Sequence, residues 1–325
     1  MIRIGIVGYG NLGKGVELAI SQNEDMKLVA VFSRRELGAG TLKSPDTKLL
    51  HISKAPEMQN EIDVMILCGG SATDLPEQGP MFARLFNTVD SFDTHAKIPA
   101  FYEAMDEAAK AGNNVAIISA GWDPGLFSMN RVLADAVLPK GNGYTFWGKG
   151  VSQGHSDAIR RVKGVKYGVQ YTVPKEEALQ KVRSGENPRL STRQMHLRDC
   201  YVVAEDGADK RAIEEEIRNM PNYFADYDTK VTFISEDEFF KNHTAMPHGG
   251  FVMRSGITAD NSNHIVEFSL KLDSNPMFTA SVLVAFARAA YKLSREGHKG
   301  AKTVLDIPLA YLSPKTPEQL RKEFI

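Results

Sequence analysis

Three glycines near the start of the chain have the spacing of a loop that binds phosphate groups. They lie in Gly8-Tyr9-Gly10-Asn11-Leu12-Gly13, a G-x-G-x-x-G pattern. Gly8 permits a tight turn, Gly10 lets the backbone approach a pyrophosphate, and Gly13 lets a helix pack close to a strand. The pattern alone also suits an ordinary glycine-rich turn. Because it follows an apolar run and opens an amphipathic segment, it predicts a dinucleotide site at a helix N-terminus.

The end of the second expected strand indicates which dinucleotide binds. An NAD site usually carries Asp or Glu there, about 20 residues beyond the glycines, to bond the ribose 2′-hydroxyl. This chain instead has Ser33-Arg34-Arg35, and a guanidinium can hold the 2′-phosphate of NADP through paired hydrogen bonds. The alternative is that both arginines are solvated loop charges beside Glu36. We expect NADP as the cofactor.

A third loop, Cys68-Gly69-Gly70-Ser71, follows another buried apolar run. Ligands of parallel sheets bind outside the carboxyl ends of the strands, and small residues suit a loop beneath a cofactor. Cys68 is a tempting nucleophile, but a small buried residue at a strand end is the better interpretation.

Two acids occupy equivalent positions after the next two expected strands. Asp93 follows Thr88–Phe92, and Asp123 follows Val115–Ser119. Two carboxylates at the top of one sheet are suited to hold a substrate ammonium and to accept its proton. The alternatives are an Asx turn at Asp93 and a helix cap at Asp123, which precedes Pro124.

Basic groups for a substrate carboxylate come from the second half of the chain. Arg198 lies at the start of an expected strand, and His248 lies in an expected turn. Arg binds carboxylates bidentately, although position alone favours structural roles for both residues. The sequence has no HExxH, paired CxxC or comparable ligand set, so we expect no metal site. It also lacks a nucleophile–base motif for acyl transfer.

The first 120 residues alternate between strand and helix patterns. Continuous apolar runs predict strands buried on both faces, and apolar residues at helical spacing predict the helices between them. This alternation predicts an α/β fold with a Rossmann-type parallel sheet. The expected strands are Ile2–Val7, Lys27–Phe32, Val64–Cys68, Thr88–Phe92 and Val115–Ser119, and helices are expected after Gly10, at Pro76–Phe86 and at Ile98–Ala111.

The rest of the chain has longer, partly alternating strands, which predict an α+β region with an open mixed sheet. We place the dinucleotide-binding domain at residues 1–120, with residues 296–325 packing back on it, and a substrate-binding and dimerisation region at 121–295. The expected strands are Tyr144–Trp147, Val169–Val173, Cys200–Ala204, Lys230–Ile234 and Ile265–Leu272; helices are expected at Lys175–Arg183, Lys210–Met220 and Phe278–Arg295.

Composition narrows the classes of partner. The chain has 325 residues, 39 of them basic and 40 acidic, which leaves no long-range field for nucleic acid or an anionic membrane. Two cysteines are not a disulfide framework and fit a reducing compartment. The chain runs from its first residue into a strand, without a signal-peptide pattern. We expect a soluble cytoplasmic protein with a small-molecule substrate.

Taken together, these segments resemble the meso-diaminopimelate dehydrogenase family over essentially the whole chain. The glycine motif is common to many families, whereas the later segments together are highly specific. Those segments are Gly121-Trp122-Asp123-Pro124-Gly125, Thr145-Phe146-Trp147-Gly148, Ser152-Gln153-Gly154-His155-Ser156-Asp157 and Met246-Pro247-His248-Gly249-Gly250.

The resemblance implies NADP-dependent oxidative deamination of the D-centre of meso-2,6-diaminopimelate, in a homodimer. It implies that Asp93, Asp123, Trp147 and Gln153 surround the reacting centre, and that Thr172, Arg198, His248 and Asn275 hold polar groups, chiefly carboxylates. The implied NADP contacts are Tyr9 to Leu12, Ser33 to Arg35, Cys68-Gly69-Gly70-Ser71, Ser91-Phe92-Asp93 and Ala120-Gly121-Trp122-Asp123-Pro124.

Three other functions are compatible with parts of the sequence. A semialdehyde-type dehydrogenase needs a thiol nucleophile, and Cys68 is badly placed for that role. A non-catalytic NADP-binding sensor has no need of the Asp, Arg and His set. A broader D-amino acid dehydrogenase shares the cofactor site but not strict charge pairing with the substrate.

Overall fold

The computed structural model of the chain describes residues 1–38 and 40–325. It divides into two compact units, Met1–Met129 with Pro276–Ile325, and Asn130–Asn275. These units differ from the expected division at residues 120 and 296, because residues 121–129 and almost all of helix α10 (Asn275–Arg295) lie in the first unit. The packing of α10, described below, gives the physical reason for the second difference.

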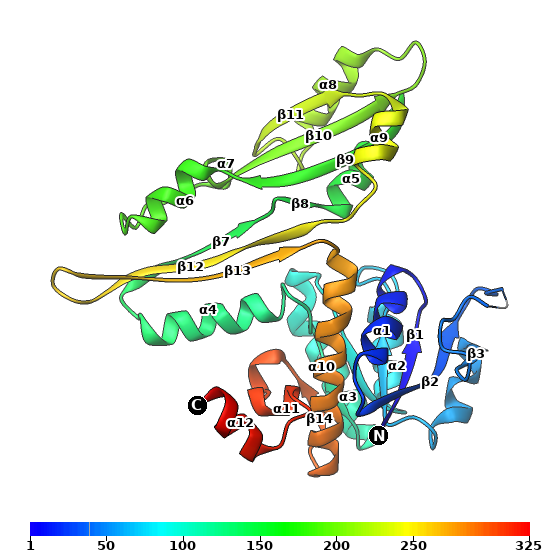
Figure 1. Cartoon of the computed structure of the whole chain (residues 1–325). Coiled ribbons are helices and arrows are strands. Elements are labelled where there is room, and N and C mark those ends of the chain that lie inside the picture. The colour runs from blue at the N-terminus through cyan, green and yellow to red at the C-terminus, as the bar shows by residue number, and fades with distance from the viewer. Residues whose placement is uncertain (39) are drawn as a thin grey trace. The chain divides into compact units, whose positions relative to one another are not determined.

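The first unit is built on a seven-stranded sheet in which every pairing is parallel. Its order is β14-β6-β5-β4-β1-β2-β3. Strands β1, β2, β3 and β14 of this sheet are labelled in Figure 1. The parallel pairing confirms the predicted Rossmann-type sheet, and it brings the carboxyl ends of all seven strands to one edge. The strands are β1 (Ile2–Val7), β2 (Met26–Ser33), β3 (Lys48–His51), β4 (Val64–Leu67), β5 (Asn87–Asp90), β6 (Val115–Ile117) and β14 (Gly300–Lys302).

Helices cover both faces of this sheet. On one face, Ile4 and Ile6 of β1 share a core with Leu283 and Phe286 of α10. On the other, Met65 of β4 packs with residues of α2 (Leu75–Ala83) and α3 (Ile98–Gly112). Because α10 closes the core over β1, its apolar stripe belongs to the dinucleotide-binding unit. Helix α1 (Asn11–Ser21) and the 3-10 segments Ile52–Met58 and His95–Lys97 complete this part of the chain.

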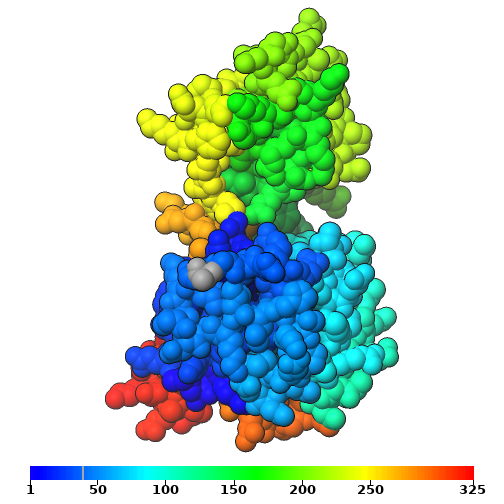
Figure 2. Space-filling view, turned by 90° about the vertical axis from the view of Figure 1, so that its right-hand side faces the viewer, coloured from blue at the N-terminus to red at the C-terminus, as the bar shows by residue number. Residues whose placement is uncertain are grey.

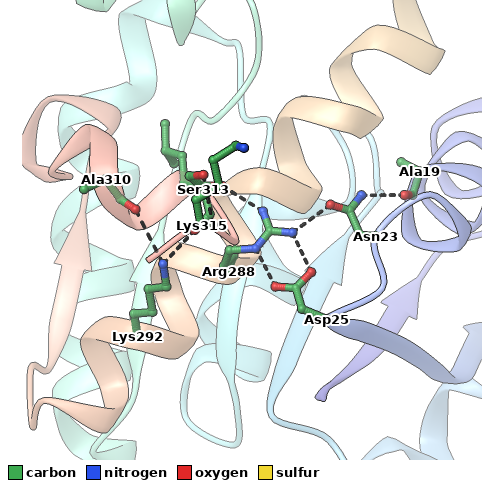
Figure 3. Close-up of polar contacts among 9 residues, drawn as sticks. Ala19, Asn23, Asp25, Arg288, Lys292, Ala310, Ser313 and Lys315 are labelled. Atoms are coloured by element: carbon green, nitrogen blue, oxygen red, sulfur yellow. Dashed lines mark hydrogen bonds and ion pairs between the residues drawn. The ribbon is translucent and has the colours of Figure 1, made fainter. Parts of the chain in front are cut away.

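Arg288 of α10 fastens the C-terminal tail to the start of the chain (Figure 3). Its guanidinium donates to both Asp25 carboxylate oxygens, at 2.6 and 2.8 Å, to Asn23 Oδ1 at 2.7 Å and to the Leu312 carbonyl at 2.7 Å. Blue N-terminal and red C-terminal segments accordingly gather in the same body (Figure 2). The tail contains a 3-10 turn (Val304–Asp306), α11 (Leu309–Leu312) and α12 (Pro317–Phe324).

The second unit has two sheets. In the four-stranded sheet, β10 (His196–Ala204) pairs antiparallel with β9 (Val165–Pro174) and parallel with β11 (Asp228–Phe233), so the predicted mixed sheet is confirmed. Strand β8 (Gly150–Val151) pairs with the other side of β9. The three-stranded sheet is antiparallel, in the order β13-β12-β7, and consists of β7 (Gly141–Trp147), β12 (His248–Ala259) and β13 (Ser262–Leu272).

Six helices flank these sheets: α4 (Leu126–Val137), which begins in the first unit, α5 (Gln153–Arg160), α6 (Glu176–Arg183), α7 (Thr192–Met195), α8 (Lys210–Asn219) and α9 (Glu236–Asn242). Within the described ranges, none of the helices combines the length and apolar character needed to cross a bilayer.

The turn predicted at His248 is wrong, because this residue lies in strand β12. His248 begins this strand, and Gly249 and Gly250 continue it. A Cβ atom at Gly249 would lie 2.2 Å from the Leu270 carbonyl oxygen, and one at Gly250 would lie 2.2 Å from the Phe146 carbonyl oxygen. The two glycines are therefore required by close contact with both neighbouring strands, and they do not mark a turn.

Candidate active site

The glycine loop after β1 has the geometry that its spacing predicts. Gly8 has a φ of +91°, and its N–H donates to the Phe32 carbonyl of β2 at 2.9 Å. A Cβ atom at Gly13 would lie 2.2 Å from the Gly8 carbonyl oxygen, whereas one at Gly10 would meet nothing within 4 Å. Gly8 thus makes the turn, Gly13 brings α1 against it, and Gly10 leaves the N-terminus of α1 open to a ligand.

A cavity of about 330 Å³ lies over this loop, at the carboxyl ends of three parallel strands. Eight of the residues expected to bind NADP line it, together with Asp74 and Gln78. The eight are Gly8, Tyr9 and Gly10 after β1, Ser33, Arg34 and Arg35 after β2, and Cys68 and Gly69 after β4.

Asp74 holds Arg34 at the wall of this cavity. Arg34 Nη2 lies 2.6 Å from Asp74 Oδ1, and the other carboxylate oxygen accepts from the Gly70 N–H at 2.9 Å. The Arg34 side chain remains 63% exposed, so its guanidinium is available to a phosphate in the cavity. Burial raises the pKa of the Cys68 thiol, so the thiol stays neutral. A neutral thiol is typical of a packing residue and not of a nucleophile.

The two candidate acids follow neighbouring parallel strands, β5 and β6. Asp93 is exposed, and its N–H donates to Ser71 Oγ at 3.1 Å. The half-buried Asp123 lies in a tight loop, in which a Cβ atom at Gly125 would come within 1.6 Å of the Gly121 carbonyl oxygen. Both acids therefore lie at the sheet edge that carries the glycine loop. The Asx-type bond in this region is formed by Asp90, whose Oδ1 accepts from the N–H of Phe92.

In the second unit, Arg198 is a buried cation that lacks an anion. It is 6% exposed, its Nη1 donates to Thr172 Oγ1, and its guanidinium carbon lies 3.8 Å from the centre of the Tyr227 ring. Among the described residues no carboxylate lies within ion-pair distance of Arg198, and its Nε has no hydrogen-bond partner. Burial lowers the pKa of Arg198, but an arginine remains charged. Such a site is suited to an anion from outside the chain.

Two histidines near Arg198 are held neutral. Burial, reinforced by the positive charge of Arg198, lowers the pKa of His155 and of His196 to about 4. His196 Nε2 accepts from the Trp147 N–H at 2.9 Å, and the two rings stack with their centres 5.6 Å apart. With both imidazoles neutral, the charge next to them is that of Arg198, and His196 holds the backbone at the end of β7.

The other predicted substrate residues of the second unit are linked to these by close packing. A Cβ atom at Gly150 would lie 2.5 Å from the His248 ring, and Gly150 pairs with Thr172. Gln153 Nε2 lies 3.3 Å from the Met246 sulfur, and the Asn275 N–H donates to the Met246 carbonyl at 2.9 Å. Trp147, Gln153, Thr172, Arg198, His248 and Asn275 therefore share one region of this unit.

Comparison with known proteins assigns the family. The family model described as Diaminopimelic acid dehydrogenase C-terminal domain matches residues 121–274. A meso-diaminopimelate D-dehydrogenase from Ureibacillus thermosphaericus is 65% identical over 324 residues, which is 100% of this chain and 99% of that protein. The chain belongs to the meso-diaminopimelate D-dehydrogenase family.

Solved structures of the family have the same fold. DAP dehydrogenase of Corynebacterium glutamicum in complex with DAP has a TM-score of 0.91 and 49% identity, covering 100% of this chain and 99% of that one. An engineered D-amino acid dehydrogenase bound to NADP⁺ has a TM-score of 0.86 and 48% identity, with the same coverage.

Four residues with clear places in these sites have no assigned role in the sequence analysis: Asp74, Asp90, His196 and Tyr227. One signal was available for His196, because it precedes Arg198 by two positions and strand residues two apart share a face. Each of the other three has a partner in a remote part of the sequence: Arg34 for Asp74, Ser119 for Asp90 and Arg198 for Tyr227. In the described part of the chain, His, Cys, Asp and Glu side chains form no group of three that could hold a metal ion.

Proposed function

We propose that this protein catalyses the NADP-dependent oxidative deamination of the D-centre of meso-2,6-diaminopimelate. The products are L-2-amino-6-oxopimelate, ammonia and NADPH, and the reverse reaction is reductive amination. The observation that carries the proposal is the buried Arg198, which has no carboxylate partner in the part of the chain that the structure describes, in a member of this family. The complex of the C. glutamicum relative with DAP supports the choice of substrate.

The residues present fit NADP. The glycine loop leaves the backbone open to a pyrophosphate, and Arg34 and Arg35 line the same cavity, where a 2′-phosphate needs a guanidinium. We assign the loops ending in Leu12, Arg35 and Ser71 to this cofactor, with the segments 91–93 and 120–124. When bound, NADP⁺ accepts the hydride that leaves the reacting carbon.

Asp93 and Asp123 are assigned to the reacting end of the substrate. The amine must be neutral before its carbon is oxidised, so an ammonium has to lose a proton first. A carboxylate that binds the ammonium is placed to accept that proton, directly or through water. Hydrolysis of the resulting imine then releases ammonia. Trp147 and Gln153 are assigned to the walls around the D-centre.

The substrate carboxylates are assigned to Arg198, Thr172, His248 and Asn275. Diaminopimelate has two ammoniums and two carboxylates, and a complementary site needs acids for the first pair and cationic or neutral donors for the second. A substrate without one of these charges would leave a buried protein group unpaired, which lowers its binding.

The test is NADPH formation with meso-, LL- and DD-diaminopimelate, D-alanine and D-lysine, each with NADP⁺ or NAD⁺. We expect turnover confined largely to the meso isomer with NADP⁺. Comparable turnover of D-alanine would leave the NADP site as proposed, but it would contradict the proposed pairing of substrate charges with protein groups. NADP binding without turnover of any substrate would replace the enzyme assignment with a sensor.

Arg34→Ala is expected to weaken NADP⁺ binding about tenfold or more while changing NAD⁺ binding by less than about twofold, because only NADP⁺ offers a 2′-phosphate to the guanidinium. Titration calorimetry with each cofactor measures this. Arg84→Ala is the control, because Arg84 is an exposed arginine of the same unit outside the cavity. Equal weakening of both cofactors would assign Arg34 to the fold and not to NADP selection.

A cytoplasmic homodimer is part of the same proposal. Helix α4 exposes Val132, Leu133 and Val137, which are 51, 61 and 55% accessible. Next to them a cavity of about 390 Å³ is lined by Arg131 and by residues of β7 and β12. An exposed apolar face of this kind supports a second copy as the partner. Light scattering measures the mass of the purified protein in solution. A mass equal to that of one chain would contradict the proposed homodimer.

A further inference from the structure

Asp90 lies in the first unit and makes contacts that the local sequence around it does not predict. It is the last residue of β5 and is completely buried. One oxygen of its carboxyl group, Oδ1, accepts hydrogen bonds from the Phe92 N–H at 2.9 Å and from the Ser119 N–H at 3.1 Å. Its backbone carbonyl accepts from the Ala120 N–H at 2.8 Å. One residue therefore holds the backbone of two segments that are far apart in the sequence.

These two segments carry the acids assigned to the reacting amine. Phe92 immediately precedes Asp93, and Ala120 lies three residues before Asp123. The Phe92 ring is itself fixed by stacking on Phe101, with ring centres 4.1 Å apart. The Asp90 bonds consequently set the backbone positions from which both acidic side chains extend.

This arrangement is costly for the fold. The second carboxyl oxygen, Oδ2, is buried and has no hydrogen-bond partner among the described residues. Burial raises the pKa of Asp90 to about 7, although the two N–H donors oppose that rise. Ser119 adopts a left-handed φ of +55°, which is unfavourable for a residue with a side chain. Buried unpaired polar groups and strained residues concentrate where a fixed local geometry is needed.

We propose that Asp90 is a positioning residue for the reaction: its carboxyl group is the common acceptor that fixes the Asp93 and Asp123 segments relative to each other. Asp90 touches neither substrate nor cofactor and acts through the backbone of both segments. This inference rests on the proposed function, because it concerns the two acids assigned there.

Three variants test the proposal. Asp90→Leu removes the acceptor and keeps the number and branching of the side-chain heavy atoms, and Asp90→Asn keeps an acceptor oxygen. Thr88→Val is the control, because Thr88 is equally buried on the same strand and its hydroxyl also has no hydrogen-bond partner in the described ranges of the chain. The readouts are kcat and KM for meso-diaminopimelate, the dissociation constant of NADP⁺, and hydrogen–deuterium exchange of residues 91–95 and 118–124.

We expect Asp90→Leu to lower kcat about 10²-fold, because small misplacements of reacting groups have effects of this size. Its NADP⁺ dissociation constant should rise by a smaller factor than kcat falls, about tenfold at most, because the glycine loop and Arg34 line the cofactor cavity from outside the two segments. Hydrogen–deuterium exchange should rise in both segments together. Asp90→Asn and Thr88→Val should stay within about fivefold of the parent kcat. A purely structural role would instead raise the NADP⁺ dissociation constant by the same factor as it lowers kcat.

Two results would overturn the inference. One is an equal loss of kcat in Asp90→Asn and Asp90→Leu, since the first keeps the acceptor. The other needs no variant: unprotected exchange of the Phe92 or Ser119 amide in the parent protein would show that the shared bonds are not held. Failure of the parent protein to oxidise meso-diaminopimelate would count against the proposed function, and the exchange measurements would still test the shared bonds.

Discussion

Arg198→Met is expected to lower kcat/KM for meso-diaminopimelate by about 10²- to 10³-fold, a loss of the size measured when a buried charged partner is removed from a recognition site. The reason is that Arg198 is the buried cation to which a substrate carboxylate is assigned, and a thioether offers no donor in its place. The NADP⁺ dissociation constant should stay within about twofold, because the cofactor residues belong to the other unit.

The same substitution should leave the protein as stable as before, or make it more stable. Arg198 has no carboxylate partner among the described residues, so its removal strands no opposite charge. Replacing a buried charge by an apolar side chain of similar length removes a desolvation penalty. Thr172 Oγ1 loses the guanidinium donor but keeps a contact with Gln170 Nε2 at 3.3 Å.

Arg254→Met is the matched control in the same unit. Arg254 is also buried, but it pairs with Asp135 at 2.8 Å and donates to the Leu138 carbonyl at 2.6 Å. Its loss should lower the free energy of unfolding by about 1–3 kcal/mol, because the Leu138 and Pro139 carbonyls lose their donor, while the 70% exposed Asp135 is solvated by water. If Arg198→Met proves as destabilising as Arg254→Met, then Arg198 is a structural residue and the substrate carboxylate binds elsewhere.

The parallel sheet was predictable because its strands are buried on both faces. Ile4 and Ile6 of β1 and Val64 to Leu67 of β4 are fully buried, and continuous apolar runs of this kind have few alternatives. Strand β12 was missed for the opposite reason. Its glycines at 249 and 250 are the usual mark of a turn, and their actual role depends on the carbonyls of two other strands.

The candidate site also has some features that local sequence predicts and others that depend on contacts between remote residues. The glycine loop and the Arg34-Arg35 pair depend on local order along the chain, so a short motif predicts them. The bonds that hold the site together join residues 40 apart for Arg34 and Asp74, 29 apart for Asp90 and Ser119, and 49 apart for Trp147 and His196. No local pattern encodes such pairs, because they exist only after the strands are in register.

The second large effect is expected at Arg288, which links helix α10 and the C-terminal tail to the start of the chain. Its side chain is 3% exposed, and it joins α10 to Asp25, Asn23 and the tail carbonyl of Leu312. We expect Arg288→Met to lower the free energy of unfolding by about 3–5 kcal/mol, because removing one partner of a buried ion pair leaves the other uncompensated. Urea denaturation, with limited proteolysis of residues 303–325, measures the loss and shows whether the tail detaches.

Arg3→Met is the control that shows whether the loss of stability in Arg288→Met depends on the burial of the arginine or only on its charge. Arg3 makes the same kind of forked contact, with Asp63, but its side chain is 45% exposed, and Asp63 would keep the hydrogen bond from the Arg3 backbone N–H at 2.8 Å. The loss of the Arg3 side chain should therefore cost only about 1 kcal/mol. Acidification gives a second comparison. Arg288 holds the pKa of Asp25 below its ordinary value of 3.8, so the pair stabilises the fold above that pH and loses its effect as the pH falls below it. The difference between the parent protein and Arg288→Met should therefore narrow below about pH 4. A constant difference across that range would mean that packing of the Arg288 stem, and not its ion pair, holds the tail in place.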